Sequence, residues 1–317
     1  MVAGPIERAS NLLPQINLDK KKIDTDAIIA GFLQFIYGLF KKVVVADTAA
    51  LYVDSIYNNY EYHGGLTLTL ATIFFAIQIY ADFSGYSDMA IGCARMLGFK
   101  LMDNFHLPFF SKSMTEMWRR WHISLGNWAN DYMFKSFSPY WVRKFGKNGI
   151  FISLLITFTL IGLWHGARWT YILFGVFQGL ILGIEFLSKK RRNKLKKRIG
   201  KPLFKYAGWF ITMFLWFISM VLFRSIDLTQ ILFILKKIFT LSIFEGFRIQ
   251  DTSVFANLLI GTFVLMLLDY GVFRKHTFFG IVKKSNLQLV SSFSAFLILL
   301  IVLFGVSEGS QFIYFQF

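Results

Sequence analysis

Long apolar runs separated by shorter polar segments set the pattern of this chain. Most runs approach the roughly 20 residues that an α-helix needs to cross a bilayer, so they predict membrane-spanning helices. The first is shorter because Lys41 and Lys42 interrupt it, and a short run is as typical of a buried or re-entrant helix. The apolar runs cover residues 27–40, 66–80, 150–164, 170–187, 204–223, 254–273 and 290–306.

Polar residues are concentrated where the second apolar run ends, in the sequence YADFSGYSDMAIG of residues 80–92. Asp82, Ser84 and Asp88 surround Gly85 there. Polar, glycine-containing backbone at membrane depth is tolerated only when it is buried in protein or lines a wet cavity. We therefore expect a helix break at Gly85.

Two later apolar segments, residues 149–165 and 170–187, are joined by a short connection and predict a tight helical hairpin. The second segment carries Gly175, Gly179 and Gly183 at intervals of four residues, which places small residues along one helix face. Such a stripe allows a neighbouring helix to approach closely.

Residues 99–148 form a long segment without a spanning run. Ser113 followed by Glu116 has the pattern of a capping box, which predicts the start of a helix. The aromatic and apolar residues that follow recur at helical spacing, at Trp118, Trp121, Leu125 and Trp128. The pattern predicts a helix that lies at the membrane interface with its aromatic face toward the lipid.

Composition supports a membrane protein, since 55% of the 317 residues are hydrophobic and 19% are aromatic. The net charge of +16 is carried by loops between apolar runs, which argues against nucleic-acid binding and for orientation by the positive-inside rule. Residues 189–205 hold ten Lys and Arg and no acid, so we expect this loop to be cytoplasmic, together with residues 99–148 and 274–286. The single cysteine, Cys93, permits no internal disulfide. The first residues have neither a basic start nor an apolar core, so no cleaved signal peptide is expected.

The five histidines of the chain lie in different settings. His165 closes an apolar run, and His122 lies on the expected interfacial helix. An ionisable group at membrane depth is by default a functional-site hypothesis, although His165 could equally cap a helix end or bond to backbone. We expect His63 and His276 to be solvated and His106 to serve local packing. A metal site is not expected, because no Cys or carboxylate lies at ligand spacing from the histidines.

At these residues the chain resembles the membrane-bound O-acyltransferase (MBOAT) family, in particular the branch of bacterial alginate O-acetyltransferases and teichoic-acid D-alanyl transferases. The resemblance covers the chain almost end to end. The family pattern has several more membrane helices before the element that begins here at residue 2, so the chain resembles the C-terminal two-thirds of a member. The matching stretches are VAGPIER (2–8), GLFKKVVVAD (38–47), YADFSGYSDMAIG (80–92), NFHLPFFSKSMTEMWRRWHISLGNWANDY (104–132), LIGLWHGARWTYILFG (160–175), VLFRS (221–225) and FIYFQF (312–317).

The resemblance implies one MBOAT-like membrane domain over residues 1–317, in the inner or plasma membrane of a bacterium. This domain would be an all-α polytopic bundle of tilted and broken transmembrane helices, with interfacial helices, around a central tunnel. His165 would be the essential catalytic histidine, and His122 the second histidine near the reaction centre. Further residues would shape the tunnel or its cytoplasmic mouth, namely Asp82, Tyr86, Arg119, Arg120, Trp121 and Trp164.

The resemblance also implies the reactants and partners. The donor would be a cytosolic acyl thioester, expected to be acetyl-CoA, with no cofactor held by the protein. The partners would be membrane lipid and either a polysaccharide or an extracytoplasmic acyltransferase.

These features predict a membrane-bound O-acyltransferase that acetylates a cell-envelope polysaccharide. Neutral His165 would take the proton from an acceptor hydroxyl, which then attacks the thioester carbonyl. Two other interpretations stay open. Acidic residues and a histidine inside apolar segments are also typical of a proton-coupled transporter, although the sequence shows no internal repeat. A chain that lacks the family's first helices could also be a truncated, inactive fragment.

Overall fold

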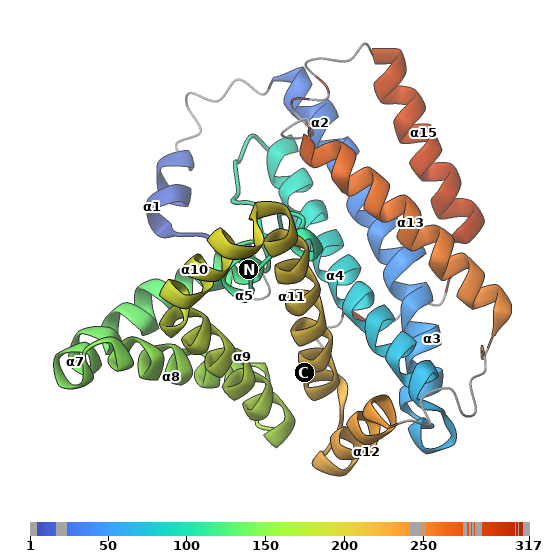
Figure 1. The fold of residues 1–317 in the computed structure, drawn as a ribbon. Helices are drawn as coiled ribbons and strands as arrows, with labels where there is room; N and C mark the ends of the chain where they lie inside the picture. Colours follow the sequence, from blue (N-terminus) through green and yellow to red (C-terminus); the bar gives the residue numbers. More distant parts are fainter. Residues whose placement is uncertain are drawn as a thin grey trace. The chain divides into compact units, whose positions relative to one another are not determined.

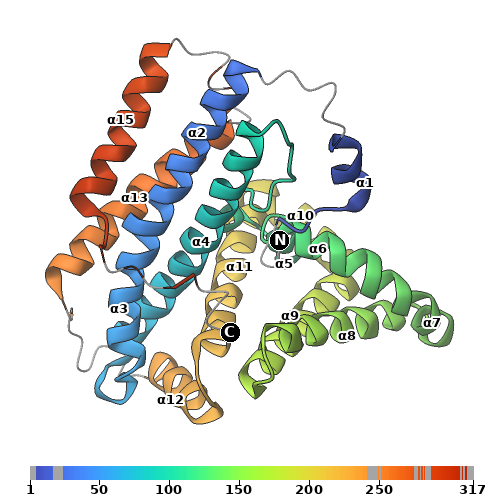
Figure 2. The same ribbon diagram turned by 180° about the vertical axis from the view of Figure 1, so that it is seen from behind.

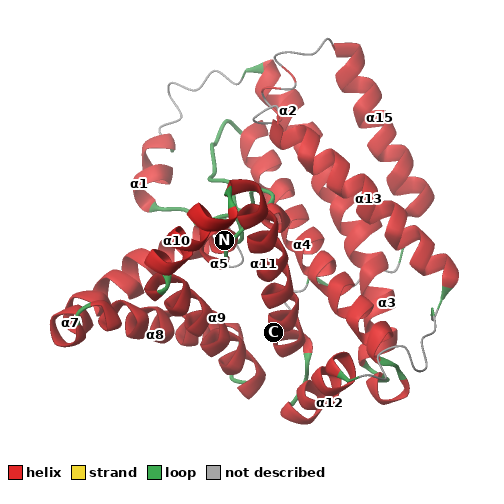
Figure 3. Ribbon diagram, viewed as in Figure 1, coloured by secondary structure: helices red, strands yellow, loops and turns green. Residues whose placement is uncertain are grey.

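The computed structural model describes residues 5–16, 24–240, 249, 251–274, 278, 280, 282, 287–307, 309 and 311–312. All the regular elements in this part of the chain are helices (Figure 3). Seven helical stretches among the described residues are long and apolar enough to cross a membrane. They are Thr25–Tyr57, Gly65–Met96, Lys147–His165, Trp169–Leu187, Lys201–Arg224, Thr252–Gly271 and Leu287–Phe304. The prediction of an all-α polytopic membrane protein is thereby confirmed.

The chain divides into two compact units. The first unit comprises Met1–Asn59, Ile73–His106 and Arg248–Gln316. The second comprises Tyr60–Thr72 and Leu107–Phe247, with Phe317. The tunnel and the single domain over residues 1–317 stay predictions.

The helices are labelled in Figure 1. The first unit contains α1 (Ala9–Leu12), α2 (Thr25–Phe40), α3 (Asp47–Tyr57), most of α4 (Gly65–Met96), α13 (Thr252–Arg274) and α15 (Leu287–Phe304). The second contains α5 (Met114–Trp118), α6 (Ile123–Ala129), α7 (Lys135–Phe145), α8 (Lys147–His165), α9 (Trp169–Leu187), α10 (Lys189–Ile199), α11 (Lys201–Arg224) and α12 (Leu228–Phe239).

The helix that begins at Thr25 does not end at the two lysines. A π-helical segment, Lys41–Ala46, joins α2 directly to α3, so the helical stretch continues to Tyr57. Of the two interpretations that the sequence leaves open for residues 27–40, the structure supports the spanning helix. The reason is that both lysine side chains form ion pairs with carboxylates of the first unit, so their charges are tolerated inside the helix.

Gly85 lies inside the continuous helix α4, so the expected helix break is wrong. Its lack of a side chain serves the crossing of α4 with α2, which run side by side in Figures 1 and 2. A Cβ atom on Gly85 would lie 2.7 Å from the carbonyl oxygen of Gly38, and one on Gly38 would lie 2.5 Å from that of Gly85. The two glycines therefore permit backbone contact between the helices.

The segment after Ser113 begins as predicted but does not form one long helix. The Ser113 side chain accepts a hydrogen bond from the Glu116 backbone N–H, which caps α5. Helix α5 ends at Trp118, and α6 begins after His122, whose backbone is left-handed with φ of 45°. The expectation of one interfacial helix with a continuous aromatic face was therefore wrong.

The predicted hairpin of residues 149–165 and 170–187 is confirmed by α8 and α9, which lie side by side in Figures 1 and 2. The glycine stripe has the expected function. A Cβ atom on Gly175 would lie 2.3 Å from the carbonyl oxygen of Phe158, and one on Gly179 would lie 2.7 Å from the Cα of Leu155. Close helix packing of this kind replaces the hydrophobic effect as a source of association within a bilayer.

The later elements follow the sequence pattern with small changes. The sequence also predicts an amphipathic segment over residues 228–244, and its first part forms α12, which Asp227 caps by accepting a hydrogen bond from the Gln230 backbone N–H. This helix ends at Phe239, and residues 241–244 lie outside the described part of the chain. The basic run after α9 forms α10, most of whose side chains are exposed.

Replacing Gly38 with alanine should destabilise the first unit, because the new methyl group would overlap the backbone of α4. Overpacking of this kind costs about 1–3 kcal/mol. Gly271→Ala is the matched control, since a Cβ atom there would meet nothing within 4 Å. We expect a lower midpoint of thermal unfolding in detergent for Gly38→Ala and an unchanged or slightly higher one for Gly271→Ala. Equal midpoints would refute the close crossing.

Candidate functional site

The two histidines singled out from the sequence come together in the second unit. His165 is the last residue of α8, and His122 immediately precedes α6. The centre of the Trp164 ring lies 4.9 Å from that of His165 and 6.4 Å from that of His122. Both imidazoles are buried, with 8% of His165 and 1% of His122 exposed. The sequence prediction of a paired-histidine site is thus compatible with the geometry.

Aromatic side chains from two other helices surround His165. Its ring centre lies 5.1 Å from that of Phe223 on α11, and 6.2 and 6.5 Å from those of Phe174 and Tyr171 on α9. These rings restrict the imidazole to one region and remove water from around it. A neutral imidazole is favoured in such an environment, because burial penalises its charged form.

The backbone of His122 has a conformation that few residues with a side chain adopt. Its φ and ψ angles of 45° and 54° lie in the left-handed region. Histidine is among the residue types enriched there, and such conformations cluster at functional sites. Burial lowers the pKa of His122 well below its usual value of 6.5, and the nearby His165 lowers it further. His122 is therefore neutral at pH 7.

Trp121 and Trp164 lie in the same part of the second unit. The Trp121 ring packs on Trp216 of α11 with 4.8 Å between ring centres. Trp118, one turn earlier on α5, donates a hydrogen bond from Nε1 to Gln178 Oε1 at 3.1 Å. Trp164 is half exposed. Trp121 and Trp164, two of the six tunnel residues expected from the resemblance, thus each neighbour one of the two histidines in the chain.

The two arginines of this segment have other surroundings. The Nη2 atom of Arg120 pairs with Glu116 Oε1 at 2.8 Å, an i,i+4 contact that reinforces α5 and the turn after it. Arg119 is exposed and lines a cavity together with residues of α10. Their predicted contribution to a tunnel mouth stays untested.

Asp82 and Tyr86 lie on α4 in the first unit, where each has a packing role. The Lys42 ammonium pairs with Asp82 Oδ1 at 3.0 Å and with Asp47 Oδ1 at 2.8 Å. The Tyr86 ring stacks on Phe312 with 4.6 Å between ring centres. These contacts tie α4 to the π segment, to α3 and to the C-terminal part of the chain, and the tunnel role of both residues stays a prediction.

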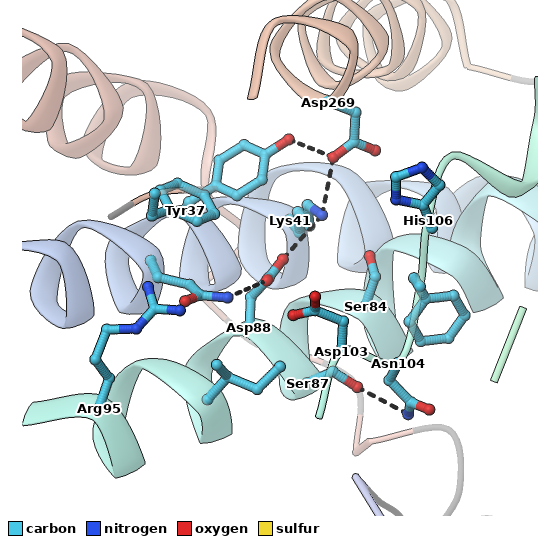
Figure 4. Close-up of a pocket in the computed structure, with 14 residues that line it drawn as sticks. Tyr37, Lys41, Ser84, Ser87, Asp88, Arg95, Asp103, Asn104, His106 and Asp269 are labelled. Carbon is cyan, nitrogen blue, oxygen red and sulfur yellow. Dashed lines mark hydrogen bonds and ion pairs between the residues drawn. The ribbon is translucent and has the colours of Figure 1, made fainter. Parts of the chain in front are cut away.

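A polar cavity of about 170 Å³ in the first unit was not expected from the sequence (Figure 4). The Lys41 ammonium lies between two carboxylates, 2.9 Å from Asp88 Oδ2 and 3.0 Å from Asp269 Oδ1. Gln34 donates a hydrogen bond to Asp88, and the hydroxyl groups of Tyr37 and Tyr80 donate to Asp269. The chain of contacts links α2, α4 and α13.

The signal for this network was present in the sequence, as one aspartate inside an apolar run and a lysine and an aspartate that follow two other apolar runs. The sequence did not show that Lys41 pairs with Asp88 and Asp269, because the three residues come from three separate segments. Asp269 lies near the end of a span, where the sequence predicts a helix-packing or interfacial role, and its ion pair with Lys41 joins α13 to the π segment. Within the described ranges, no group of three or more His, Cys, Asp or Glu residues could hold a metal ion.

The remaining histidines differ from the expectation in part. His63 is buried rather than solvated, and it lies two residues before the start of α4. His106 is exposed and lines the polar cavity of the first unit. His276 lies outside the described residues.

Replacing Lys41 with glutamine should destabilise the protein strongly, because a buried carboxylate, Asp269, and a mostly buried one, Asp88, would lose their cation. Breaking a buried pair in this way costs about 3–5 kcal/mol. Lys135→Gln makes the same chemical change at an exposed pair, where 66% of Lys135 is accessible, and costs about 1 kcal/mol or less. Unfolding of the two variants in detergent measures the difference. Equal losses of stability would contradict the proposed role of the network.

The sequence of this chain is similar to those of known proteins. The sequence model of the MBOAT, membrane-bound O-acyltransferase family, matches residues 1–225. The probable alginate O-acetylase of Pseudomonas aeruginosa is 35% identical over 284 residues, which cover 88% of this chain and 51% of that relative. The peptidoglycan O-acetyltransferase of Helicobacter pylori is 31% identical over 237 residues, which cover 74% of this chain and 44% of that relative.

A third relative is the teichoic acid D-alanyltransferase of Streptococcus thermophilus, which is 35% identical over 168 residues, or 48% of this chain and 40% of the relative. The chain therefore spans about half the length of the curated relatives it matches. The family match includes α5 to α9, and with them both buried histidines. On these matches, the chain belongs to the membrane-bound O-acyltransferase family.

Proposed function

We propose that the protein catalyses transfer of an acyl group, specifically acetyl, from a cytosolic thioester donor to a hydroxyl group of a cell-envelope polysaccharide. The observation that carries the proposal is the meeting of His122 and His165 at one tryptophan ring. Family membership and the named acyl transfers of the relatives support the same reaction class. The donor would be acetyl-CoA, and the protein would act in the bacterial inner or plasma membrane.

In the proposed step, neutral His165 acts as the general base. The unprotonated nitrogen of its ring takes the proton from the acceptor O–H while the oxygen attacks the thioester carbonyl carbon. The tetrahedral intermediate then collapses, the C–S bond breaks, and the imidazolium returns its proton to the departing thiolate. The products are an ester and a free thiol. Aromatic rings around the imidazole would exclude water, which would otherwise compete as the acceptor.

His122 would position the donor. A neutral imidazole carries one N–H, which can donate a hydrogen bond to the thioester oxygen as negative charge develops there. Its left-handed backbone fixes the direction of the side chain at the start of α6. Geometry set by a strained backbone is expected where a group has to be pre-positioned for a reaction.

The carboxylates that suggested a proton-coupled transporter are ion-paired. Asp82 pairs with Lys42, Asp88 with Lys41, and Glu185 with Arg192, at 2.9–3.0 Å. Each of these carboxylates thus has a cationic partner that joins two segments of its own unit. The pairing therefore favours a structural role for these acids over proton transport.

His165→Ala should abolish transfer while the protein still inserts and folds. Loss of a general base lowers the rate by on the order of 10²–10⁴-fold. The measurement is mass spectrometry of envelope polysaccharide, together with release of thiol from acetyl-CoA by purified protein. His106→Ala, at an exposed histidine of the first unit, should retain activity. Unchanged acetylation by His165→Ala, or no acetylation by the wild type, would overturn the proposal.

The depressed pKa of His122 also predicts a pH dependence of stability. Below pH 6.5 the unfolded chain binds a proton at His122 and the folded chain does not, so stability falls as pH falls. The slope from one such group is at most about 1.4 kcal/mol per pH unit. We therefore expect the wild type to lose more stability between pH 8 and pH 5.5 than His122→Gln does. Parallel losses in thermal unfolding would show that His122 is not buried in its neutral form.

A further inference from the structure

The second unit contains a cavity of about 650 Å³, and neither His122 nor His165 is among the residues that line it. It lies where α8 begins and α9 ends, and residues of α5 and α10 complete it. Its volume falls within the range of about 300–1,000 Å³ that is typical of ligand sites. Apolar residues form one part of its lining, namely Phe134, Ile150, Leu154, Leu182, Phe186 and Phe204.

Four cationic side chains form the other part: Arg119, Lys189, Arg192 and Lys196. The one acid in the lining, Glu185, is already engaged. Its carboxylate accepts hydrogen bonds from the backbone N–H groups of Met114 and Thr115, at 3.2 and 2.9 Å, and pairs with Arg192 at 3.0 Å. Within the part of the chain that the structure describes, Arg192 is the one of the four cations that pairs with a carboxylate. The cavity is therefore electropositive.

The apolar and the cationic residues of the lining lie at different positions along the axis of the spanning helices. Ile150, Leu154 and Leu182 belong to the spans α8 and α9, whereas the lysines belong to α10, which follows the end of α9. The basic residues also mark this end of the spans as the cytoplasmic one by the positive-inside rule. Apolar walls at acyl-chain depth and cations at headgroup depth match the two parts of one membrane lipid.

We propose that this cavity binds an anionic phospholipid, with its phosphate among Arg119, Lys189 and Lys196 and an acyl chain along Ile150, Leu154 and Leu182. A water-soluble phosphate would leave the apolar lining without a partner. A lipid without net charge would leave the cations unmatched. Basic residues at this depth attract anionic headgroups, so both parts of the lining favour the same ligand.

The test uses the full chain purified in detergent and titrated with phosphatidylglycerol, with bound lipid counted by native mass spectrometry. The variant Lys189→Gln with Lys196→Gln removes two cations of the cavity, and we expect binding to weaken by on the order of 30-fold. The control Lys194→Gln with Lys197→Gln makes the same change at exposed positions of α10 that do not line the cavity. The control should bind almost as tightly as the wild type.

Competitors separate the possible ligands. Glycerol 3-phosphate, which has the phosphate but no acyl chain, and phosphatidylcholine should displace phosphatidylglycerol poorly. Equal weakening in both double variants would show unspecific attraction to a basic helix and overturn the proposal. Displacement by acetyl-CoA at similar concentration would assign the cations to the donor and also overturn it. His165→Ala should bind the lipid like the wild type. Lipid binding is thus measured independently of acyl transfer, and either proposal can fail without the other.

Discussion

Charge inside apolar helices has to be met by opposite charge from another segment, and this constraint governs the first unit. Lys41 lies in the middle of a helical stretch long enough to cross a membrane, where an unpaired ammonium would cost several kcal/mol. Asp88 and Asp269 supply its partners from α4 and α13. The same interaction therefore makes the lysine tolerable and specifies which helices are neighbours. Gly38 and Gly85 complete the arrangement by allowing α2 and α4 to touch.

The second unit uses polar groups differently. Glu185, near the end of an apolar helix, accepts hydrogen bonds from the start of α5 and so fixes where that short helix begins. Trp118 is held by Gln178. These contacts set the path of the chain just before His122, which then turns through a left-handed conformation into α6. The position of one imidazole thus depends on polar contacts made by α5, while the other is fixed by the end of α8.

The sequence was sufficient for features that depend on local pattern. Apolar length predicted the spans, the spacing of Gly175 and Gly179 predicted the packing of α9 on α8, and Ser113 predicted a helix cap. Features that depend on distant segments were missed. A glycine such as Gly85 can break a helix or allow close contact, and only the facing residue decides. The helical spacing of Trp118, Trp121, Leu125 and Trp128 continues past His122, and no glycine or proline there signals that α5 and α6 are separate helices.

The site shows the same difference between features that follow from local sequence and features that depend on distant segments. Both histidines were recognised by their motifs, and the structure brings them together in the second unit. Asp82 and Tyr86 were grouped with them from the resemblance, but their observed contacts are an ion pair and a ring stack in the first unit. Their contribution to a tunnel therefore stays a prediction, because the sequence motif names the residues but not the side chains that they contact.

The account therefore rests on the pair of imidazoles as the reaction centre. A structure determined with a non-hydrolysable analogue of acetyl-CoA tests this most directly. We expect the carbonyl group of the analogue to lie within hydrogen-bonding distance of His122, with His165 able to reach a hydroxyl placed beside it. A carbonyl group bound in the polar cavity around Lys41, or anywhere that both imidazoles cannot reach, would contradict the assignment.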